Sequence, residues 1–228
     1  MTELRPLLER IRLAVFDFDG VFTDNRVWVN ERGEELLAFT RSDGLGLRRL
    51  DEVGVQYLIV SMEQNPVVAA RAEKLRADYV QGVDNKLPVL RERAERLGVS
   101  LEDTAYVGND INDAECLRAA GVPVVPADAW PEVKSLARWV LARSGGAGCV
   151  REFCDAVWEA HRRGAVHLPA AVADKVEEAR VMPPRFLRGG GGGVGSEARV
   201  AGRLDATHVR RHVDRAHGCR AGAGRDGR

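Results

Sequence analysis

Short apolar runs alternate with longer amphipathic segments from residue 11 to about residue 163. An unbroken apolar run is typical of a strand buried on both faces, and apolar residues at helical spacing are typical of helices that cover a sheet. The expected strands span residues 12–16, 55–61, 104–110 and 122–126. The expected helices span residues 42–54, 66–77, 86–98, 111–121, 131–143 and 149–163. This alternation predicts an α/β fold of three layers, Rossmann-like, in which a parallel sheet has helices on both faces.

Residues 26–39 interrupt this rhythm. The segment "RVWVNERGEELLAF" has two β-prone arms around a polar "NERGEE" turn, which predicts an inserted β-hairpin. Its alternating apolar residues Val27, Val29, Leu37 and Phe39 need a covering surface, either from the same chain or from a partner.

The last part of the chain has a different composition. It is rich in Gly, Arg and Ala and has few large apolar residues. Such a segment cannot bury enough apolar surface to offset its chain entropy, so we expect disorder. The sequence therefore predicts a folded domain over residues 1–164 and a Gly/Arg-rich tail over residues 165–228.

The balance of charges excludes some classes of protein. Lys+Arg and Asp+Glu both number 34, so the zero net charge does not favour a nucleic-acid-binding protein. No stretch approaches the roughly 18 uninterrupted apolar residues of a membrane span, and the N-terminus lacks the apolar core of a secretory signal. The four cysteines form no CxxC pair, which is typical of reduced thiols. We expect a cytoplasmic protein without a membrane or nucleic-acid partner.

Three carboxylates crowd the segment "VFDFDGVFTD" (residues 15–24), in which Asp17 and Asp19 directly follow an expected strand. Carboxylates this close repel one another unless a cation or a reaction compensates. Ser61 and the acids of "GNDIND" follow two other expected strands. In a parallel sheet the carboxyl ends of the strands meet at one edge, where ligands bind, so the sequence predicts a polar site there.

The residue types at this edge suit phosphoryl transfer. A carboxylate can attack phosphorus to form an aspartyl-phosphate, and a second carboxylate nearby can donate a proton. The charge on the phosphate oxygens requires a cation, and the hard ion Mg²⁺ suits carboxylate ligands. Ser61 and Lys86 have the hydroxyl and the point charge that hold phosphate oxygens.

Together these stretches resemble the four motifs of the haloacid dehalogenase-like phosphohydrolases. More closely, residues 11–160 look like the 3-deoxy-octulosonate 8-phosphate phosphatases, the N-acylneuraminate 9-phosphate phosphatases and the phosphatase module at the C-terminus of some CMP-sialate synthetases. The similar stretches are "DFDGVFTD", "SDGLGL", "VSMEQNPVVAARAEKL", "NKL", "AYVGNDINDAECLRAAGVPVVPADA" and "GGAGCVREFCD". The resemblance implies a haloacid dehalogenase-like fold without a large cap domain, Mg²⁺ as cofactor, and a homotetramer in which the hairpin packs against other subunits.

The resemblance also implies a role for each residue that matches a motif. Asp17 would be the nucleophile and Asp19 the general acid and base. The Asp17 carboxylate and the Asp19 backbone carbonyl would bind Mg²⁺. Ser61 and Lys86 fall on the phosphate-binding positions.

The fourth motif departs from the family pattern. Many relatives have GDDxxD, and this chain has Asn109 where the first acid would be. Either the Asn109 carboxamide oxygen binds the metal or Asp110 does so in its place, and we take Asp110 as the ligand. Asp113 would then orient the metal ligands or Lys86.

Three further residues are candidates for contact with the substrate. Asp43 is assigned as an N-cap acid of the helix expected at 42–54, in a loop that relatives use near substrate. Glu63 resembles an acid of the nine-carbon ulosonate phosphatases. Arg151 follows "GGAG", where a neighbouring subunit would help to close the site, and is a candidate ligand for a substrate carboxylate. Asp24 is assigned equally to a turn and to catalysis.

The sequence therefore predicts a Mg²⁺-dependent phosphomonoesterase that acts on a small sugar phosphate. We favour a sialic-acid-like 9-phosphate of nine carbons, with octulosonate 8-phosphate close behind. The alternative is a catalytically weak oligomerisation or regulatory module, against which the intact Asp17, Asp19, Lys86 and Asp110 argue.

Overall fold

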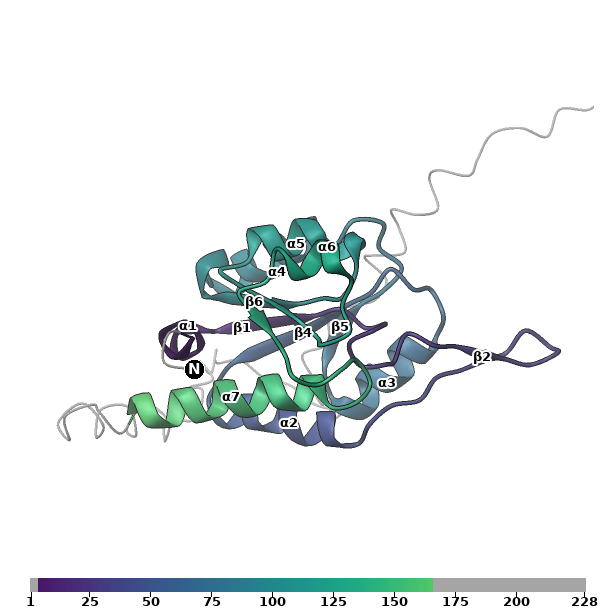
Figure 1. Cartoon of the computed structure of the whole chain (residues 1–228), viewed down its shortest axis with the longest axis horizontal. Coiled ribbons are helices and arrows are strands. Elements are labelled where there is room, and N and C mark those ends of the chain that lie inside the picture. Colours follow the sequence, from purple (N-terminus) through teal and green to yellow (C-terminus); the bar gives the residue numbers. More distant parts are fainter. Residues whose placement is uncertain (1–3, 166–228) are drawn as a thin grey trace, which may run out of the picture. The chain divides into compact units, whose positions relative to one another are not determined.

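A computed structural model of the chain describes residues 4–165, which form a parallel sheet of six strands between two layers of helices (Figure 1). The strand order is β5-β4-β1-β6-β7-β8. The strands are β1 (Leu13–Phe16), β4 (Gln56–Val60), β5 (Asp78–Val80), β6 (Thr104–Val107), β7 (Val122–Val125) and β8 (Trp139–Val140). The prediction of an α/β fold with a parallel sheet is confirmed.

Each face of the sheet has its own hydrophobic core. In β1 the side chains alternate, so that Ala14 and Phe16 join one core and Leu13 and Val15 join the other. The first core is covered by α1 (Arg5–Arg10), α2 (Ser42–Glu52), α3 (Val67–Leu75) and α7 (Cys149–Ala165). The second is covered by α4 (Lys86–Leu97), α5 (Ala114–Ala119) and α6 (Pro131–Lys134). The central strand is therefore buried on both sides, as its unbroken apolar sequence predicts.

The register of the central strands brings the expected site residues together. Phe16 at the end of β1 pairs with Ile59 of β4 on one side and with Val107 of β6 on the other. The ladder continues one residue further, because the Asp17 N–H donates to the Val107 carbonyl at 2.9 Å. The chain order changes direction at β1, and this is the position in a parallel sheet where ligands bind.

The hairpin consists of β2 (Trp28–Val29) and β3 (Glu35–Leu36), which pair Trp28 with Leu36. It projects away from the helices in Figure 1. The predicted need for a cover is met in part: Leu37 and Phe39 pack against the first core. Trp28 and Leu36, which pair across the two strands, form an exposed apolar face of the hairpin, and Val27 and Val29 on the opposite side are also at least half exposed. Neither side has a cover within residues 4–165.

Residues 131–143 correct the prediction of a single helix. The helix ends at Lys134, and Trp139–Val140 add an edge strand to β7. The chain passes from one face of the sheet to the other here, because Val133 belongs to the second core and Leu141 to the first. A continuous helix would lie on one face only, so the crossing requires an extended segment. The short elements α1 and β5 were also not predicted.

The tail predicted over residues 165–228 lies, except for its first residue, outside the part of the chain that the structure describes. Residue 165 is the last residue of α7. Among the helices of residues 4–165, none combines the length and the apolar character needed to cross a bilayer.

Candidate active site

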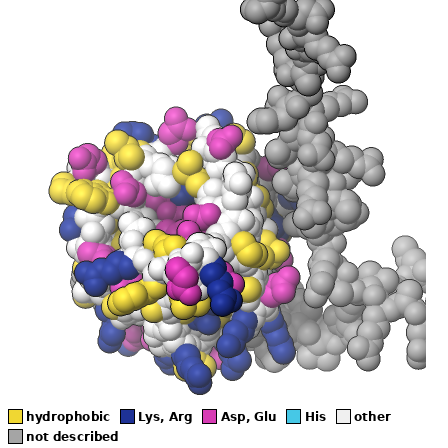
Figure 2. Space-filling view, turned by 90° about the vertical axis from the view of Figure 1, so that its right-hand side faces the viewer, with side chains coloured by type: hydrophobic (Ala, Val, Ile, Leu, Met, Phe, Trp, Pro, Cys, Tyr) yellow, Lys and Arg dark blue, Asp and Glu magenta, His cyan; other side chains and the backbone are white. Residues whose placement is uncertain are grey.

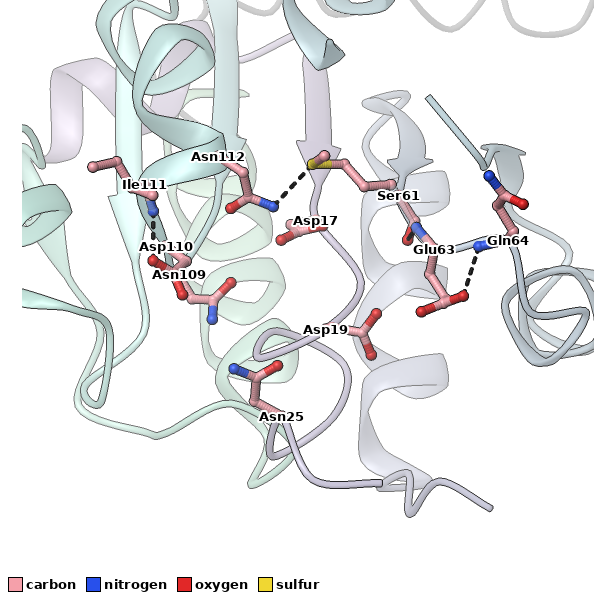
Figure 3. A pocket seen from close by; sticks show the side chains of 11 residues that line it. Asp17, Asp19, Asn25, Ser61, Glu63, Gln64, Asn109, Asp110, Ile111 and Asn112 are labelled. Atoms are coloured by element: carbon pink, nitrogen blue, oxygen red, sulfur yellow. Dashed lines mark hydrogen bonds between the residues drawn. The ribbon is translucent and has the colours of Figure 1, made fainter. Parts of the chain in front are cut away.

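A cavity of about 610 Å³ opens at the carboxyl edge of the sheet. Figure 2 shows this face, with acidic side chains gathered near its middle, and Figure 3 shows the cavity from close by. The lining residues are Asp17, Asp19, Asn25, Ser61, Met62, Glu63, Gln64, Asn109, Asp110, Ile111 and Asn112. The ends of β1, β4 and β6 thus contribute side chains to one cavity, as expected from the sequence.

Asp17 lies at the base of the cavity and is 4 % exposed. Its Oδ1 accepts hydrogen bonds from the Phe18 N–H at 2.7 Å and lies 2.7 Å from the Lys86 ammonium. Burial, and then the charge of Asp113, raise the pKa of Asp17 in the protein without a cation, while the contact with Lys86 opposes the rise. The Oδ2 atom points toward Asn109.

Lys86 joins Asp17 to Asp113, which lies 2.8 Å away on its other side. Burial lowers the pKa of Lys86, but the two carboxylates outweigh this effect and raise it above its ordinary value. The ammonium therefore stays charged. The contact expected between Asp113 and Lys86 is present.

Asp113 is fully buried and uses both of its carboxylate oxygens. Oδ1 accepts hydrogen bonds from Lys86 and from the Tyr106 hydroxyl at 2.7 Å, and Oδ2 accepts from the backbone N–H groups of Asn109 at 2.9 Å and Asp110 at 3.3 Å. Asp113 thereby holds both the lysine and the loop that follows β6. Tyr106 was not predicted as part of the site, although a tyrosine buried in a strand requires a partner for its hydroxyl.

Asp19 stands beside Asp17 and turns its carboxylate toward Glu63 across the cavity (Figure 3). Burial, and then the charge of Glu63, raise the pKa of Asp19, while a hydrogen bond from the Thr23 hydroxyl opposes the rise. A carboxylic acid whose pKa is raised is better able to carry a proton near neutral pH.

The loop after β4 forms another wall. The Ser61 hydroxyl accepts a hydrogen bond from the Glu63 N–H at 3.0 Å and keeps its own proton for donation. The Glu63 carboxylate is held by the N–H groups of Gln64 and Asn65 at 2.7 and 2.8 Å. Asn112 donates to the Met62 sulfur at 3.4 Å, which links this wall to the loop after β6 (Figure 3).

Asn109 and Asp110 are placed differently. The Asp110 carboxylate accepts hydrogen bonds from backbone N–H groups of its own turn, including Ile111 at 2.7 Å. The end of the Asn109 amide lies against Asp17 Oδ2 and the backbone carbonyl of Asp19, and its oxygen faces them in one of its two orientations. These three oxygens fit a hard cation. The geometry favours Asn109 as the third ligand, whereas we had taken Asp110 from the sequence.

This donor set uses only one side-chain carboxylate. Consistently, within residues 4–165 no three His, Cys, Asp or Glu side chains are grouped so that they could hold a metal ion. A backbone carbonyl and a carboxamide would supply the remaining oxygens.

The loop "SGGAG" (residues 144–148) packs against residues 20–24, the segment that follows Asp19. The Gly146 N–H donates to the Val21 carbonyl at 3.0 Å. A Cβ at Gly145 would come within 2.1 Å of the Gly20 carbonyl oxygen, and one at Gly146 within 2.6 Å of the Asp24 nitrogen. Only glycines allow this approach, so the loop supports residues 20–24 from behind.

Neither Asp43 nor Arg151 lines the cavity. Asp43 is buried in the first turn of α2, where Arg41 rather than Asp43 occupies the N-cap position. Its Oδ1 accepts a hydrogen bond from the Arg151 N–H in the first turn of α7, at 3.3 Å, and its Oδ2 has no hydrogen-bond partner among residues 4–165. The Arg151 side chain pairs with Asp155 at 2.6 Å. The structure therefore does not bring these two residues to the site within one chain.

Asp24 forms a turn: its Oδ1 accepts a hydrogen bond from the Arg26 N–H at 3.2 Å, and the side chain is outside the cavity lining. Of the two roles assigned to it, the turn is the one that the geometry supports. Several lining residues were not predicted, namely Asn25, Met62, Gln64, Ile111 and Asn112. Their only signal was their position one to six residues after a recognised acid or hydroxyl.

Comparisons with known proteins agree with this geometry. A family model described as haloacid dehalogenase-like hydrolase matches residues 64–151. The 3-deoxy-D-manno-octulosonate 8-phosphate phosphatase KdsC of Escherichia coli K12 is 36 % identical over 148 residues, which cover 64 % of this chain and 79 % of the relative.

Two solved structures are similar in fold. A HAD family hydrolase from Streptomyces avermitilis is 43 % identical, with a TM-score of 0.64, over 65 % of this chain and 86 % of that one. The octulosonate 8-phosphate phosphatase of Moraxella catarrhalis, solved with magnesium ion, phosphate ion and KDO, is 28 % identical with a TM-score of 0.68. It is matched over 79 % of this chain and 99 % of that one.

Gly145→Ala tests whether the loop of residues 144–148 positions residues 20–24. The added methyl group would meet a backbone oxygen, so residues 20–24 must move, and we expect the release of phosphate from a simple phosphomonoester to fall on the order of a hundredfold. Gly44→Ala is the control, because its methyl group would meet only the end of the Leu75 side chain, at 3.0 Å. Equal activity of the two variants would show that the loop does not position the site.

Asp43→Asn tests the buried carboxyl between α2 and α7. Burial raises the pKa of Asp43 to about 7, and its backbone hydrogen bond from Arg151 only partly opposes this. The native state therefore binds more protons than the unfolded state between the ordinary aspartate pKa of 3.8 and about 7, and the free energy of unfolding falls as the pH rises through that window. In urea unfolding, the free energy of unfolding of the variant, relative to that of the wild type, should rise by roughly 2–4 kcal/mol between these two pH values. Parallel pH profiles would contradict the assignment.

Proposed function

Since this chain belongs to the haloacid dehalogenase-like hydrolases and is related to the octulosonate 8-phosphate phosphatases, we propose that it hydrolyses the terminal phosphate of an ulosonate sugar phosphate through an aspartyl-phosphate. One observation carries the proposal. A buried carboxylate held by Lys86, a second carboxylate with a raised pKa, and the hydroxyl of Ser61 converge on one cavity.

The reaction follows from the positions of the two acids. The Asp17 carboxylate attacks phosphorus, the ester P–O bond breaks, and Asp19 gives its proton to the departing sugar oxygen. Asp19 then takes a proton from the water that attacks the aspartyl-phosphate, so that inorganic phosphate leaves and Asp17 is restored. The hydrogen bond from Phe18 N–H and the contact with Lys86 keep Asp17 oriented during both steps.

Lys86 and Ser61 would hold the transferred phosphoryl group. Lys86 lies behind the cavity lining, and two of its three ammonium protons are directed to Asp17 and Asp113, so the third would serve a phosphate oxygen that approaches beside Asp17. The Ser61 oxygen accepts from the Glu63 N–H, and within the described part of the chain its hydroxyl proton has no acceptor, so it can also be donated to phosphate.

The cofactor in this proposal is Mg²⁺. Asp17, the Asp19 carbonyl and Asn109 would hold it, and it would supply positive charge that lets a carboxylate approach a phosphate. The donor set of three oxygens suits this hard ion.

The choice of substrate follows the relatives. The curated relative and the Moraxella enzyme act by name on the eight-carbon ulosonate phosphate. We therefore place octulosonate 8-phosphate ahead of the nine-carbon sialic-acid-like 9-phosphate, which Glu63 had favoured. The Glu63 carboxylate remains a candidate acceptor for sugar hydroxyls, since one of its oxygens is held by two backbone N–H groups.

The charge of the cavity supports a partner subunit. Its lining has four carboxylates, and within residues 4–165 no Lys or Arg lines it. A substrate carboxylate would thus lack a counter-charge, and a neighbouring copy can supply one. We propose a homotetramer built on the exposed apolar face of the hairpin, because strands this short are marginal without packing. A cytoplasmic location is part of the same proposal.

Asp17→Asn tests the nucleophile. The amide cannot attack phosphorus, so phosphate release should fall at least about a thousandfold while the fold is retained. Asp24→Asn is the matched control, because that carboxylate only forms a turn outside the cavity, and it should keep near wild-type turnover. Full activity of the Asp17 variant would refute the mechanism.

A screen of eight- and nine-carbon ulosonate phosphates, with Mg²⁺ and with EDTA, tests the substrate and the cofactor. We expect release of phosphate that is greatest for the eight-carbon substrate and is lost in EDTA. A chain that hydrolyses none of them and still forms a tetramer would instead support the alternative of a regulatory or oligomerisation module.

Trp28→Asp tests the assembly. Trp28 is 72 % exposed, and a charge at the centre of the apolar face should disrupt a tetramer into smaller species in light scattering. Leu97→Asp on α4 introduces the same charge at another exposed apolar side chain and should leave the mass unchanged. A wild-type monomer would refute the proposed assembly.

A further inference from the structure

Hydrogen bonds hold both the backbone N–H and the backbone carbonyl of Asn109, so only its side-chain amide can turn. Its N–H donates to Asp113 at 2.9 Å, and its carbonyl accepts a hydrogen bond from the Trp130 N–H at 3.0 Å. The side chain lies against Gly20, where a Cβ would come within 2.0 Å of the amide nitrogen. Gly20 has a φ of +75°, so both its conformation and the available space select glycine beside this amide.

The oxygen and the nitrogen of the Asn109 amide have different neighbours. As placed in the structure, the oxygen faces only acceptors, Asp17 Oδ2 and the Asp19 carbonyl, and the nitrogen faces only donors. After a half-turn of the amide, the nitrogen donates to the Asp19 carbonyl at 2.8 Å and to Asp17 Oδ2 at 3.3 Å. Three oxygens that face one another require a cation between them, whereas the turned amide requires none.

We propose that Asn109 turns its amide with the metal state of the site: the oxygen binds the cation, and in its absence the nitrogen closes the site with two hydrogen bonds. This rests on the proposed function in taking the cation to be Mg²⁺. An aspartate cannot serve in both states, because both of its ends are acceptors. Asn109 thus gives the site a hydrogen-bonded form when no cation is bound.

The exchange has a consequence for affinity. A cation must displace both hydrogen bonds of the turned amide, and it gains a neutral ligand instead of an anionic one. Both effects weaken binding, since the affinity of a hard cation rises with the charge of its ligands. The metal-free chain is stabilised by the same hydrogen bonds.

Two substitutions at position 109 separate these effects. Asn109→Asp should bind Mg²⁺ at least about tenfold more tightly, and Asn109→Ala about tenfold more weakly. Both variants should unfold at a lower temperature than the wild type in EDTA, because both lose the donor to Asp17 and Asp19. Asp110→Asn is the control: it removes a carboxylate from the same loop without touching the three oxygens. It should stay within about threefold of the wild-type affinity.

The measurements are calorimetric Mg²⁺ titration of the full chain and thermal unfolding in EDTA. An Asn109→Ala variant as stable as the wild type in EDTA would show that the amide does not close the empty site. An unchanged affinity of that variant would show that the oxygen is not a ligand. Either result overturns the proposal. If a variant does not fold, the side-chain amide NMR signal of wild-type Asn109 decides, because it must lose protection from exchange when Mg²⁺ is added.

Phosphate release is measured on the same samples. A wild-type chain that shows this pattern of metal binding and hydrolyses no ulosonate phosphate would refute the proposed function and leave the role of Asn109 intact. Hydrolysis of an ulosonate phosphate by a chain whose Asn109 variants do not show the expected changes in Mg²⁺ affinity and stability would support the proposed function and refute the role of Asn109.

Discussion

The ammonium of Lys86 between the carboxylates of Asp17 and Asp113 is the interaction on which the site depends. All three side chains are almost entirely removed from solvent, with exposed fractions of 2 %, 4 % and 0 %. Burying such charges is unfavourable unless each is paired and hydrogen-bonded, and loss of one partner leaves the others uncompensated. Because the first residue of α4, the end of β1 and the turn after β6 each contribute one member, the triad also joins a covering helix to the centre of the sheet.

The same triad separates the structural part of the site from its reactive part. Asp113 is saturated by Lys86, Tyr106 and two backbone N–H groups, so it has no free oxygen for a ligand. Asp17 keeps Oδ2 directed toward Asn109, and Asp19 faces the open cavity. The glycines of residues 144–148 pack against residues 20–24 so closely that an added methyl group at Gly145 or Gly146 would clash with the backbone there. The site is thus packed on its inner side and open on its outer side, which suits the positioning of a small phosphate ester.

The hairpin lacks a cover for its apolar side chains, and the cavity lining lacks a basic side chain, within residues 4–165. The apolar face of the hairpin is exposed, and the cavity is lined by acids with the positive charge of Lys86 behind them. The Asn65 side chain donates to Glu35 of the hairpin at 2.9 Å, so the hairpin is attached to the loop that carries Glu63. A partner that covers the hairpin would therefore also lie near one wall of the cavity, which connects assembly with substrate recognition in the proposed function.

The sequence by itself determined the alternation of buried strands and covering helices, and the acids that follow β1 and β6, because these features depend on neighbours in the chain. A strand buried on both faces must be apolar throughout, and the polar residues can begin only where it ends. Tertiary structure decided what depends on residues distant in sequence. It placed Trp139 and Val140 in an edge strand and turned Asn109 rather than Asp110 toward Asp17. It also placed the Asp43 carboxyl against the Arg151 backbone and the Arg151 side chain against Asp155, both away from the cavity. Local pattern could not distinguish these outcomes, since the energy of a buried polar group depends on the partners that the whole fold brings within hydrogen-bonding distance.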